Sequence, residues 1–493
     1  MPSQTPSSKT QAETMQAEIK QPHRLGPQPL PLHLSLALTT WSNSAAILPS
    51  LMLAWQRLKA QRPGESPVEP EGAAANPRTN PGSPRDRSPF PPLPAKLEQA
   101  LRVLGPQLDA ADPAALARAL SEEGLRRLDA FVSGTLAYRQ QPTPVHRPPR
   151  PVLWSAGTTR LLDYRLTPAG QSGAPRILVI PSLINRYHIL DLAPEASFLD
   201  FLATAGCQPF VVDWGAPGKQ ERDFSLTDYI AGRLQDAYRA LQQEPGGPIF
   251  VVGYCMGGLL ALALTQLLQQ SKDLTRPAGL VLLATPWDFH AEQADQAAMI
   301  ATIGRQLEPI MAALGELPVD LLQSFFALLD PFQVPRKFQA FAALSRGQTA
   351  TDAAVQRFTL LEDWLNDGIG LAADVARECL IGWYGTNNTR NGSWRVGGNI
   401  IDPRQIAVPS LALIPDRDRI VPPGSALALA EALPNHDIAR PPAGHIGMMA
   451  GSKARSVVWP QIVEWIHQRV PASQDLASQN QASQDQASQD QGS

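Results

Sequence analysis

Short, strongly apolar runs alternate with helical patterns from Val152 to Val470, and this alternation constrains the fold more than any other feature of the chain. The runs are rich in branched aliphatic residues, as buried strands are: RILVI (176–180), QPFVVDW (208–214), PIFVVGY (248–254), GLVLLAT (279–285) and PSLALIP (409–415). Continuous apolar strands that alternate with helices form a mostly parallel sheet that is covered on both faces. The sequence therefore predicts an α/β fold.

The regular alternation is interrupted between Pro286 and Val408, which are too far apart for a single crossover connection. Three helical patterns fill this interval, at 299–314, 318–329 and 338–344. They predict a helical cap inserted over residues 286–402, which divides the core into 151–285 and 403–470. We expect this cap to cover the functional site and to move.

Both ends of the chain differ in composition from the core. Proline accounts for 48 of the 493 residues, roughly twice its usual share of about 5%. Ten of these prolines fall between Pro63 and Pro94, among Gly, Ser, Asn and Arg. Such a segment buries too little apolar surface to offset its ordering entropy, so residues 1–94 are predicted to be largely disordered. The tail at 471–493 repeats a polar ASQDQ-like pentapeptide and is also predicted to be disordered.

Two helical regions are expected ahead of the core. Residues 32–60 are apolar, contain two tryptophans and predict an amphipathic helix with a break at Pro49. This segment either docks on its own protein or attaches to a partner or hydrophobic surface. Within 95–150, apolar residues recur at helical spacing, and Asp112 followed by Pro113 is typical of a helix start. Two helices are therefore predicted there.

Charge and cysteine content narrow the class of protein. The formal net charge of −3 provides no broad positive field, so nucleic acid is not an expected partner. Three scattered cysteines without a CxxC motif support neither a disulfide framework nor a metal site. The N-terminus lacks the apolar stretch of a secretory signal, and the longest apolar run, 250–268, contains three glycines. We therefore expect a cytoplasmic protein with no transmembrane span, metal or cofactor.

The strongest chemical signal is the sequence GYCMGG, residues 253–258. It follows an apolar strand and precedes a helix, which is the setting of a nucleophile elbow with cysteine in place of the usual serine. Gly253 and Gly257 flank a turn whose central residue is strained, and a larger side chain at either position would collide with a neighbouring element. Cys255, at a helix N-terminus, gains thiolate character from the helix dipole.

A nucleophile of this kind requires an acid after a late strand and then a histidine. Asp416 and Asp418 both follow the strand at 409–415, and the residues alone do not decide between them. His445, in the sequence GHIG, is the histidine with the expected neighbourhood. The order nucleophile, acid, histidine is therefore complete.

These residues resemble the polyhydroxyalkanoate synthases. The resemblance covers roughly residues 152–470 and rests on these motifs: PSLINRYHILDL, VDWGAP, GYCMGG, LLQSFFALLDPF, LEDWLND, NGSWRVGGNIID, DRIVPP and GHIGMMAGSKAR. It implies an α/β-hydrolase core that polymerises (R)-3-hydroxyacyl groups from their CoA thioesters. The triad it implies is Cys255, Asp418 and His445, because D-x-I-V-P matches the acid of the family. The chain departs from the family at Arg419, where histidine is usual, and in its N-terminal extension.

Further expectations follow from this resemblance and the chemistry. The backbone N–H groups of Met256 and Leu183 would hold the oxyanion. The partners implied are (R)-3-hydroxyacyl-CoA, the growing polymer, a second copy of the chain or a second synthase subunit, and the surface of a polymer granule. Two alternatives stay open: a thioesterase, esterase or polymer depolymerase that uses the same triad, and an inactive paralogue that associates with granules.

Overall fold

The computed structural model describes residues 24–60, 95–142, 148–167, 173–346 and 353–470. The proline-rich stretch between Pro63 and Pro94 and the pentapeptide tail, both predicted to be disordered, lie outside these ranges. The described residues form two compact units. Of these residues, the sheet unit comprises 24–29, 138–142, 148–167, 173–331 and 353–470, and the helical unit comprises 30–60, 95–137 and 332–346.

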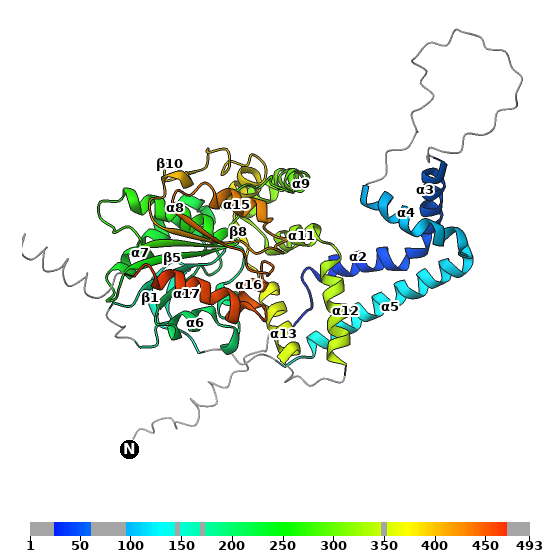
Figure 1. Ribbon diagram of the computed structural model, residues 1–493, viewed down its shortest axis with the longest axis horizontal. Coiled ribbons are helices and arrows are strands. Elements are labelled where there is room, and N and C mark those ends of the chain that lie inside the picture. The colour runs from blue at the N-terminus through cyan, green and yellow to red at the C-terminus, as the bar shows by residue number, and fades with distance from the viewer. Residues whose placement is uncertain (1–23, 61–94, 143–147, 168–172, 347–352, 471–493) are drawn as a thin grey trace, which may run out of the picture. The chain divides into compact units, whose positions relative to one another are not determined.

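An eight-stranded sheet forms the centre of the sheet unit (Figure 1). In spatial order its strands are β1 (Val152–Ala156), β2 (Thr159–Asp163), β4 (Gln208–Asp213), β3 (Arg176–Ile180), β5 (Ile249–Tyr254), β6 (Gly279–Leu283), β11 (Ser410–Leu413) and β12 (His436–Ala439). β1 pairs with β2 and β2 with β4 in antiparallel register, and all other neighbours are parallel. The predicted α/β fold with a mostly parallel sheet is confirmed.

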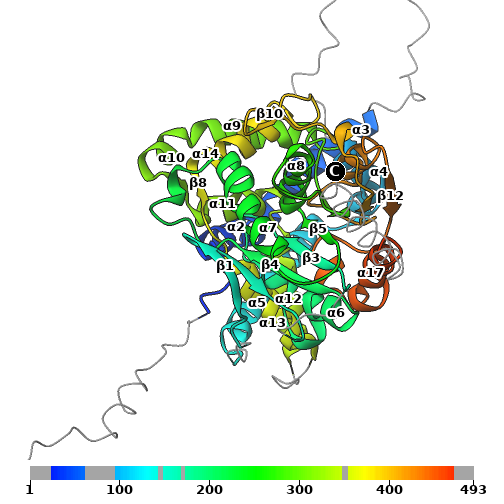
Figure 2. The same cartoon turned by 90° about the vertical axis from the view of Figure 1, so that its left-hand side faces the viewer.

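Helices cover both faces of this sheet (Figure 2). On one face lie the π-helix η6 (Asp228–Leu234), α7 (Gln235–Gln242) and α8 (Met256–Gln270). On the other lie α6 (Phe198–Thr204), α16 (Gly447–Ala450), η9 (Ala454–Val458) and α17 (Trp459–His467). The long apolar run at 250–268 is the central strand β5 followed by the buried helix α8. None of the helices in the described ranges has the length and apolar character needed to span a bilayer.

Short elements complete the connections of the sheet unit. They are η3 (Tyr187–Leu190), η4 (Pro194–Ala196), η5 (Glu221–Asp223), η8 (Pro403–Gln405), α15 (Pro423–Ala430) and the strand pair β9 (Arg395–Val396) and β10 (Asn399–Ile400). The loops after β3, β4, β5 and β11 all leave the same edge of the sheet, because these strands are parallel. Side chains from distant parts of the sequence therefore meet at this edge.

The chain between β6 and β11 is mainly helical. Besides β9, β10 and η8, its elements are α9 (Ala294–Gln306), α10 (Glu308–Leu314), β7 (Glu316–Leu317), α11 (Val319–Leu329), α12 (Gln333–Ser345), α13 (Ala353–Asn366), β8 (Leu371–Ala372), α14 (Ala373–Arg377) and the π-helix η7 (Glu378–Trp383). The predicted cap at 286–402 is not one body, since α12 clusters with the helical unit. The reason is that the apolar face of α12 packs against the helix at 113–139 of that unit. The rings of Phe338 and Phe131 meet edge-on with their centroids 6.2 Å apart.

The helical unit contains the N-terminal helices. They are α2 (Leu30–Ser42), η1 (Ser44–Ile47), α3 (Leu48–Ala60), α4 (Ala95–Ala110) and α5 (Pro113–Arg139), the last of which ends in the sheet unit. The two helices predicted within 95–150 are present, and Asp112 caps α5 by accepting a hydrogen bond from Ala115 N at 2.9 Å. Trp55 and Leu58 are buried against Leu101, which favours docking of α3 on its own chain.

The predicted break at Pro49 is wrong by several residues. The α-helix α2 ends at Ser42, the 3-10 helix η1 follows, and Pro49 is the second residue of α3. Proline is tolerated in the first turn of a helix, because the N–H that it lacks has no intrahelical acceptor there. The break lies at Asn43–Ile47, where Ser44 Oγ donates to backbone carbonyl groups of Trp41 and Leu120 instead.

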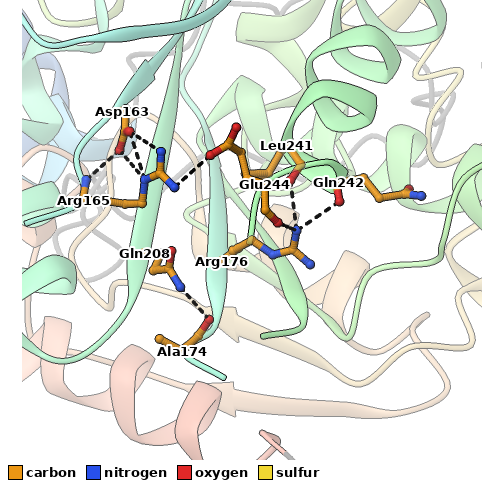
Figure 3. Close-up of polar contacts among 8 residues, drawn as sticks. All are labelled: Asp163, Arg165, Ala174, Arg176, Gln208, Leu241, Gln242 and Glu244. Atoms are coloured by element: carbon orange, nitrogen blue, oxygen red, sulfur yellow. Dashed lines mark hydrogen bonds and ion pairs between the residues drawn. The ribbon is translucent and has the colours of Figure 1, made fainter. Parts of the chain in front are cut away.

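A polar network closes the opposite edge of the sheet, where β3 and β4 begin (Figure 3). Arg176 donates to the carbonyl oxygens of Leu241, Gln242, Glu244 and Gly247, which lie at and just after the end of α7. A cation at a helix C-terminus satisfies carbonyl groups that have no intrahelical donor. This network anchors α7 to the sheet and lies away from the edge where the candidate site residues meet.

Candidate active site

Cys255 occupies the sharp turn between β5 and α8. Its backbone has φ 56° and ψ −127°, a strained conformation for a residue with a side chain. The turn is held by Cys255 N, which donates to Leu283 O at 2.8 Å, and by Gly258 N, which donates to Cys255 O at 2.9 Å. The sulfur-bearing side chain is partly buried at the carboxyl edge of the parallel strands. This geometry is that of the predicted nucleophile elbow.

The glycines of GYCMGG are required by close packing. A Cβ at Gly257 would overlap with the carbonyl oxygen of Ile180, and one at Gly253 would lie 2.5 Å from the Cα of Gly258. A Cβ at Gly258 would overlap with the side chain of Thr285, a constraint that the sequence pattern did not indicate. The glycines therefore allow α8 to start directly against β3 and β6.

His445 and Asp418 form a buried pair. His445 Nδ1 lies 2.7 Å from Asp418 Oδ2, and the two side chains are 7% and 0% exposed. Because the carboxylate only accepts hydrogen bonds, Nδ1 is the donor. Asp418 Oδ1 accepts from Ile420 N and Val421 N, both at 2.9 Å, so the carboxylate is held on both sides.

The structure distinguishes between Asp416 and Asp418, the two acids between which the residues alone did not decide. Asp416 is exposed and pairs with Arg440 at 2.9 Å, whereas Asp418 is buried against His445. Arg419, the departure from the synthase pattern, is exposed next to Asp418 and leaves this pairing intact. Asp418 is therefore the acid that can orient the histidine.

The environment of His445 favours its protonated form. Burial alone would lower the pKa of His445, but the charge of the Cys255 thiolate, hydrogen bonds to Asp418 and Cys255, and the Asp418 charge together raise this pKa to about 10. Tyr254 packs on the imidazole with ring centroids 5.2 Å apart and donates its hydroxyl to His445 O at 3.1 Å. His445 is therefore a charged hydrogen-bond donor to the Cys255 sulfur.

The two predicted oxyanion donors lie in segments that adjoin Cys255. Met256 is the first residue of α8, and the first N–H groups of a helix have no intrahelical acceptor. Leu183 is buried in the loop after β3. That loop contacts the start of α8 at Gly257 and is tied to the loop after β4, because Trp214 Nε1 donates to Pro181 O at 3.1 Å. The role of these N–H groups stays a prediction.

Aromatic side chains from the inserted segment also approach the site. Burial, followed by the charges of Cys255 and Cys379, raises the pKa of the Tyr384 phenol, which places Tyr384 within electrostatic range of the Cys255 sulfur. Phe289 holds Tyr384 from the side, with ring centroids 4.8 Å apart, and stacks on Trp383 at 5.6 Å. Sequence reasoning did not single out Tyr384, because no local motif relates the residue that follows η7 to the elbow.

The other two cysteines are packing residues of the sheet unit. Cys207 and Cys379 are buried in the two apolar clusters, and burial raises the pKa of Cys207 to about 12. Among the described residues, no cluster of three or more His, Cys, Asp or Glu side chains is arranged to hold a metal ion.

Comparison with known proteins gives three groups of findings. Residues 175–452 match the family described as alpha/beta hydrolase fold. The poly(3-hydroxyalkanoate) polymerase subunit PhaC of Haloferax mediterranei is 26% identical over 340 residues, which are 67% of this chain and 66% of that protein, just under two thirds. The proteins of the same name from Synechocystis sp. and Allochromatium vinosum are 26% and 28% identical; the matches cover 63% and 60% of this chain and 82% and 83% of theirs.

Solved structures to which this chain is similar include a monoacylglycerol lipase of Paleococcus ferrophilus and MenH from S. aureus. The lipase has a TM-score of 0.40 and 18% identity, and the match covers 60% of this chain and 97% of the lipase. MenH has a TM-score of 0.41 and 13% identity, with 64% of this chain and 99% of MenH covered.

Proposed function

The chain belongs to the alpha/beta hydrolase fold family and, within it, to the polyhydroxyalkanoate synthases, and from this premise we propose that it polymerises (R)-3-hydroxyacyl groups from their CoA thioesters. The observation that carries this proposal is the cysteine in the strained elbow beside the buried His445–Asp418 pair. An acyl group on a cysteine thioester stays activated for attack by a hydroxyl group, whereas an oxygen ester on serine would be less reactive.

In the first step, the Cys255 thiolate attacks the thioester carbonyl of the acyl-CoA. The carbonyl oxygen becomes an oxyanion, which the N–H groups of Met256 and Leu183 stabilise; one such donor contributes about 3 to 4 kcal/mol in comparable sites. The bond to CoA then breaks, and the proton held by His445 passes to the CoA sulfur. The products are free CoA, neutral His445 and an acyl-Cys255 thioester.

In the second step, His445 Nε2 accepts the proton of a 3-hydroxyl group, and the resulting alkoxide attacks the acyl-Cys255 carbonyl. An ester bond forms, the bond to Cys255 breaks, and the thiolate and imidazolium are restored. Asp418 keeps Nδ1 protonated and stabilises the imidazolium throughout. Water that reached the acyl-enzyme would release free acid instead, so polymerisation requires a dry site.

The inserted segment is the proposed cover that excludes this water. Its residues Phe289, Trp383 and Tyr384 form an aromatic group, the Cys255 charge acts on Tyr384, and His445 is 7% exposed. Cys255 is only partly buried, and an acyl-CoA is large compared with the space that a partly buried side chain leaves open. We therefore expect the segment to move when substrate enters and polymer leaves.

The expected partners follow from the relatives. The polymerases of Haloferax mediterranei and Allochromatium vinosum are named as subunits. For this chain we expect a second synthase subunit or a second copy as the protein partner, and the cytoplasmic surface of polymer granules as the location. Light scattering of the purified protein and sedimentation with polymer granules test these two expectations.

The direct test is incubation of the purified full chain with (R)-3-hydroxybutyryl-CoA. CoA thiol release is followed, the product is analysed as polymer or free acid, and mass spectrometry locates the acyl group on the protein. Cys255→Ala is the inactive variant. Cys207→Ala is its matched control, because Cys207 is buried in a packing position before β4.

We expect polymer from the parent and from Cys207→Ala, with an acyl adduct on Cys255, and no CoA release from Cys255→Ala. Free acid as the sole product would favour the hydrolase alternative. A parent chain that forms neither an adduct nor an alkylated Cys255 with iodoacetamide would favour the inactive paralogue.

A further inference from the structure

Tyr254 links the nucleophile elbow to the segment that carries the histidine of the proposed triad. It is the last residue of β5 and directly precedes Cys255 in the chain. Its side chain is 3% exposed and belongs to the apolar cluster that also contains Met448 and Met449 of α16. Since α16 begins two residues after His445, the Tyr254 side chain reaches from the central strand to the histidine segment.

Two contacts join Tyr254 to His445. The hydroxyl group of Tyr254 donates to the backbone carbonyl oxygen of His445 at 3.1 Å, and this hydrogen bond is buried. The two rings lie with their centroids 5.2 Å apart and their planes at 32°. The hydrogen bond fixes the backbone of the histidine, and the ring contact limits the orientation of its imidazole. A single residue therefore holds both the main chain and the side chain of His445.

Tyr254 restricts a motion that Asp418 leaves free. Asp418 holds Nδ1 of His445 by one hydrogen bond of 2.7 Å, and a ring can turn about a single hydrogen bond. Asp418 lies in the loop after β11, and β6 separates β11 from β5 in the sheet. The Asp418–His445 pair is therefore built two strands away from the elbow. Tyr254 connects this pair directly to β5, the strand that leads into Cys255.

The hydroxyl group of Tyr254 keeps its proton. Burial raises the pKa of this phenol well above its ordinary value, and the charges of Cys255 and Asp418 raise it further. A hydroxyl group that stays protonated remains a hydrogen-bond donor and takes no part in proton transfer. The face of an aromatic ring also attracts a cation within about 6 Å. The ring contact therefore favours the imidazolium form of His445 over the neutral form.

We propose that Tyr254 is a positioning residue of the reaction, which ties His445 to the elbow so that Nε2 stays aimed at the Cys255 sulfur. In each cycle His445 acts first as the proton donor to the CoA sulfur and then as the base for the hydroxyl group, from the same place. A displacement of about 1 Å can cost about 100-fold in rate. This inference rests on the proposed function and adds to it a residue that does not itself react.

The test compares Tyr254→Phe, which keeps the ring and removes the hydroxyl group, with Tyr254→Leu, which removes both. Tyr238→Phe is the matched control, because Tyr238 is also buried and its hydroxyl group also donates to a backbone carbonyl, Thr275 O, at 2.9 Å. The full chain is assayed for kcat and KM of CoA release from (R)-3-hydroxybutyryl-CoA. The rate at which iodoacetamide alkylates Cys255 provides a readout that needs no substrate, and thermal unfolding shows whether each variant is folded.

We expect kcat to fall about tenfold in Tyr254→Phe and about 100-fold in Tyr254→Leu, with KM within twofold of the parent in both. A fall in kcat at constant KM is the result of losing an interaction that matters only in the transition state. Alkylation of Cys255 should slow about tenfold in Tyr254→Leu, because the thiolate is the reactive form and charged His445 is the hydrogen-bond donor to the sulfur. Tyr238→Phe should stay within twofold of the parent in every measurement.

The outcomes distinguish this inference from the proposed function. A folded Tyr254→Phe and Tyr254→Leu with kcat within twofold of the parent would overturn the positioning role alone, and if Tyr254→Leu does not fold, Tyr254→Phe decides by the same limit. An equal loss in Tyr238→Phe would also overturn it, because any buried hydroxyl group would then have the same effect. If the parent releases no CoA, the proposed function fails, and equal alkylation rates in the parent and the folded Tyr254 variants would overturn the positioning role as well.

Discussion

Replacement of Asp418 by asparagine tests the site with almost no change in side-chain volume. Asp418 Oδ1 accepts two backbone hydrogen bonds, from Ile420 N and Val421 N, and Oδ2 accepts one from His445 Nδ1. In the variant, the amide oxygen has to stay on the two backbone N–H groups. Turning the amide would leave buried donors facing one another, at a cost of about 1 to 3 kcal/mol for each unsatisfied group.

The amide NH₂ group therefore faces His445 Nδ1, which must give up its proton and act as acceptor. The ring proton then lies on Nε2, on the side of Cys255, where the mechanism needs a base. In a serine protease triad, the same substitution lowers kcat by about 10⁴-fold, which corresponds to about 5.5 kcal/mol of transition-state stabilisation. We expect a loss of about 10³- to 10⁴-fold in CoA release.

Asp416→Asn is the matched control, two residues away. Asp416 is 45% exposed in its pair with Arg440, and surface pairs of this kind contribute less than about 1 kcal/mol. We expect its kcat to stay within twofold of the parent. Iodoacetamide alkylation of Cys255 at neutral pH provides a second readout that needs no substrate, and thermal unfolding shows whether each variant is folded.

The outcome that would refute this reasoning is specific. If folded Asp418→Asn kept more than a tenth of the parent kcat, the orientation of His445 by Asp418 would not matter for the reaction. If Asp416→Asn were the inactive variant, the acid would have been assigned to the wrong residue.

Three further predictions concern the elbow, the sheet and the pH dependence of stability. Gly257→Ala should lower CoA release at least 100-fold, because its Cβ would overlap with a backbone oxygen of β3, while Gly232→Ala, with no atom within 4 Å of the added Cβ, should stay within twofold. Arg176→Met removes hydrogen bonds to four carbonyl groups and should lower the free energy of unfolding in urea by about 2 to 3 kcal/mol; the exposed Arg239→Met should change it by less than about 0.5 kcal/mol. An equal effect of both substitutions would contradict the anchoring role of Arg176. The pKa of His445 is raised to about 10 in the folded state, compared with about 6.5 in the unfolded chain. The resulting stabilisation of the folded state is complete below pH 6.5 and is lost as the pH rises to about 10. Between pH 6 and 10, the free energy of unfolding of the parent should therefore fall relative to that of His445→Gln. A difference that stays constant over this range would contradict the raised pKa.

Local patterns were sufficient to predict the framework. The strand at 176–180 was predicted to the residue, because a strand buried on both faces must be apolar throughout. Cys255 was recognisable from its flanking glycines, since backbone sterics at a strained turn leave few alternatives. The break near Pro49 was misplaced, because proline has a different effect in the first turn of a helix than in its interior.

Tertiary packing decided what such patterns cannot contain. The residues alone did not decide whether Asp416 or Asp418 pairs with the histidine. Only the burial of Asp418 against His445 distinguishes the two. The Cys255 charge acts on Tyr384, and α12 clusters with the helical unit, although in both cases the residues concerned are far apart in the sequence. The sequence by itself determined the α/β framework, the elbow and the order of the candidate triad, because these follow from backbone geometry and local periodicity. Only the tertiary structure decided which of the two acids lies against His445, because this contact depends on burial that distant segments create.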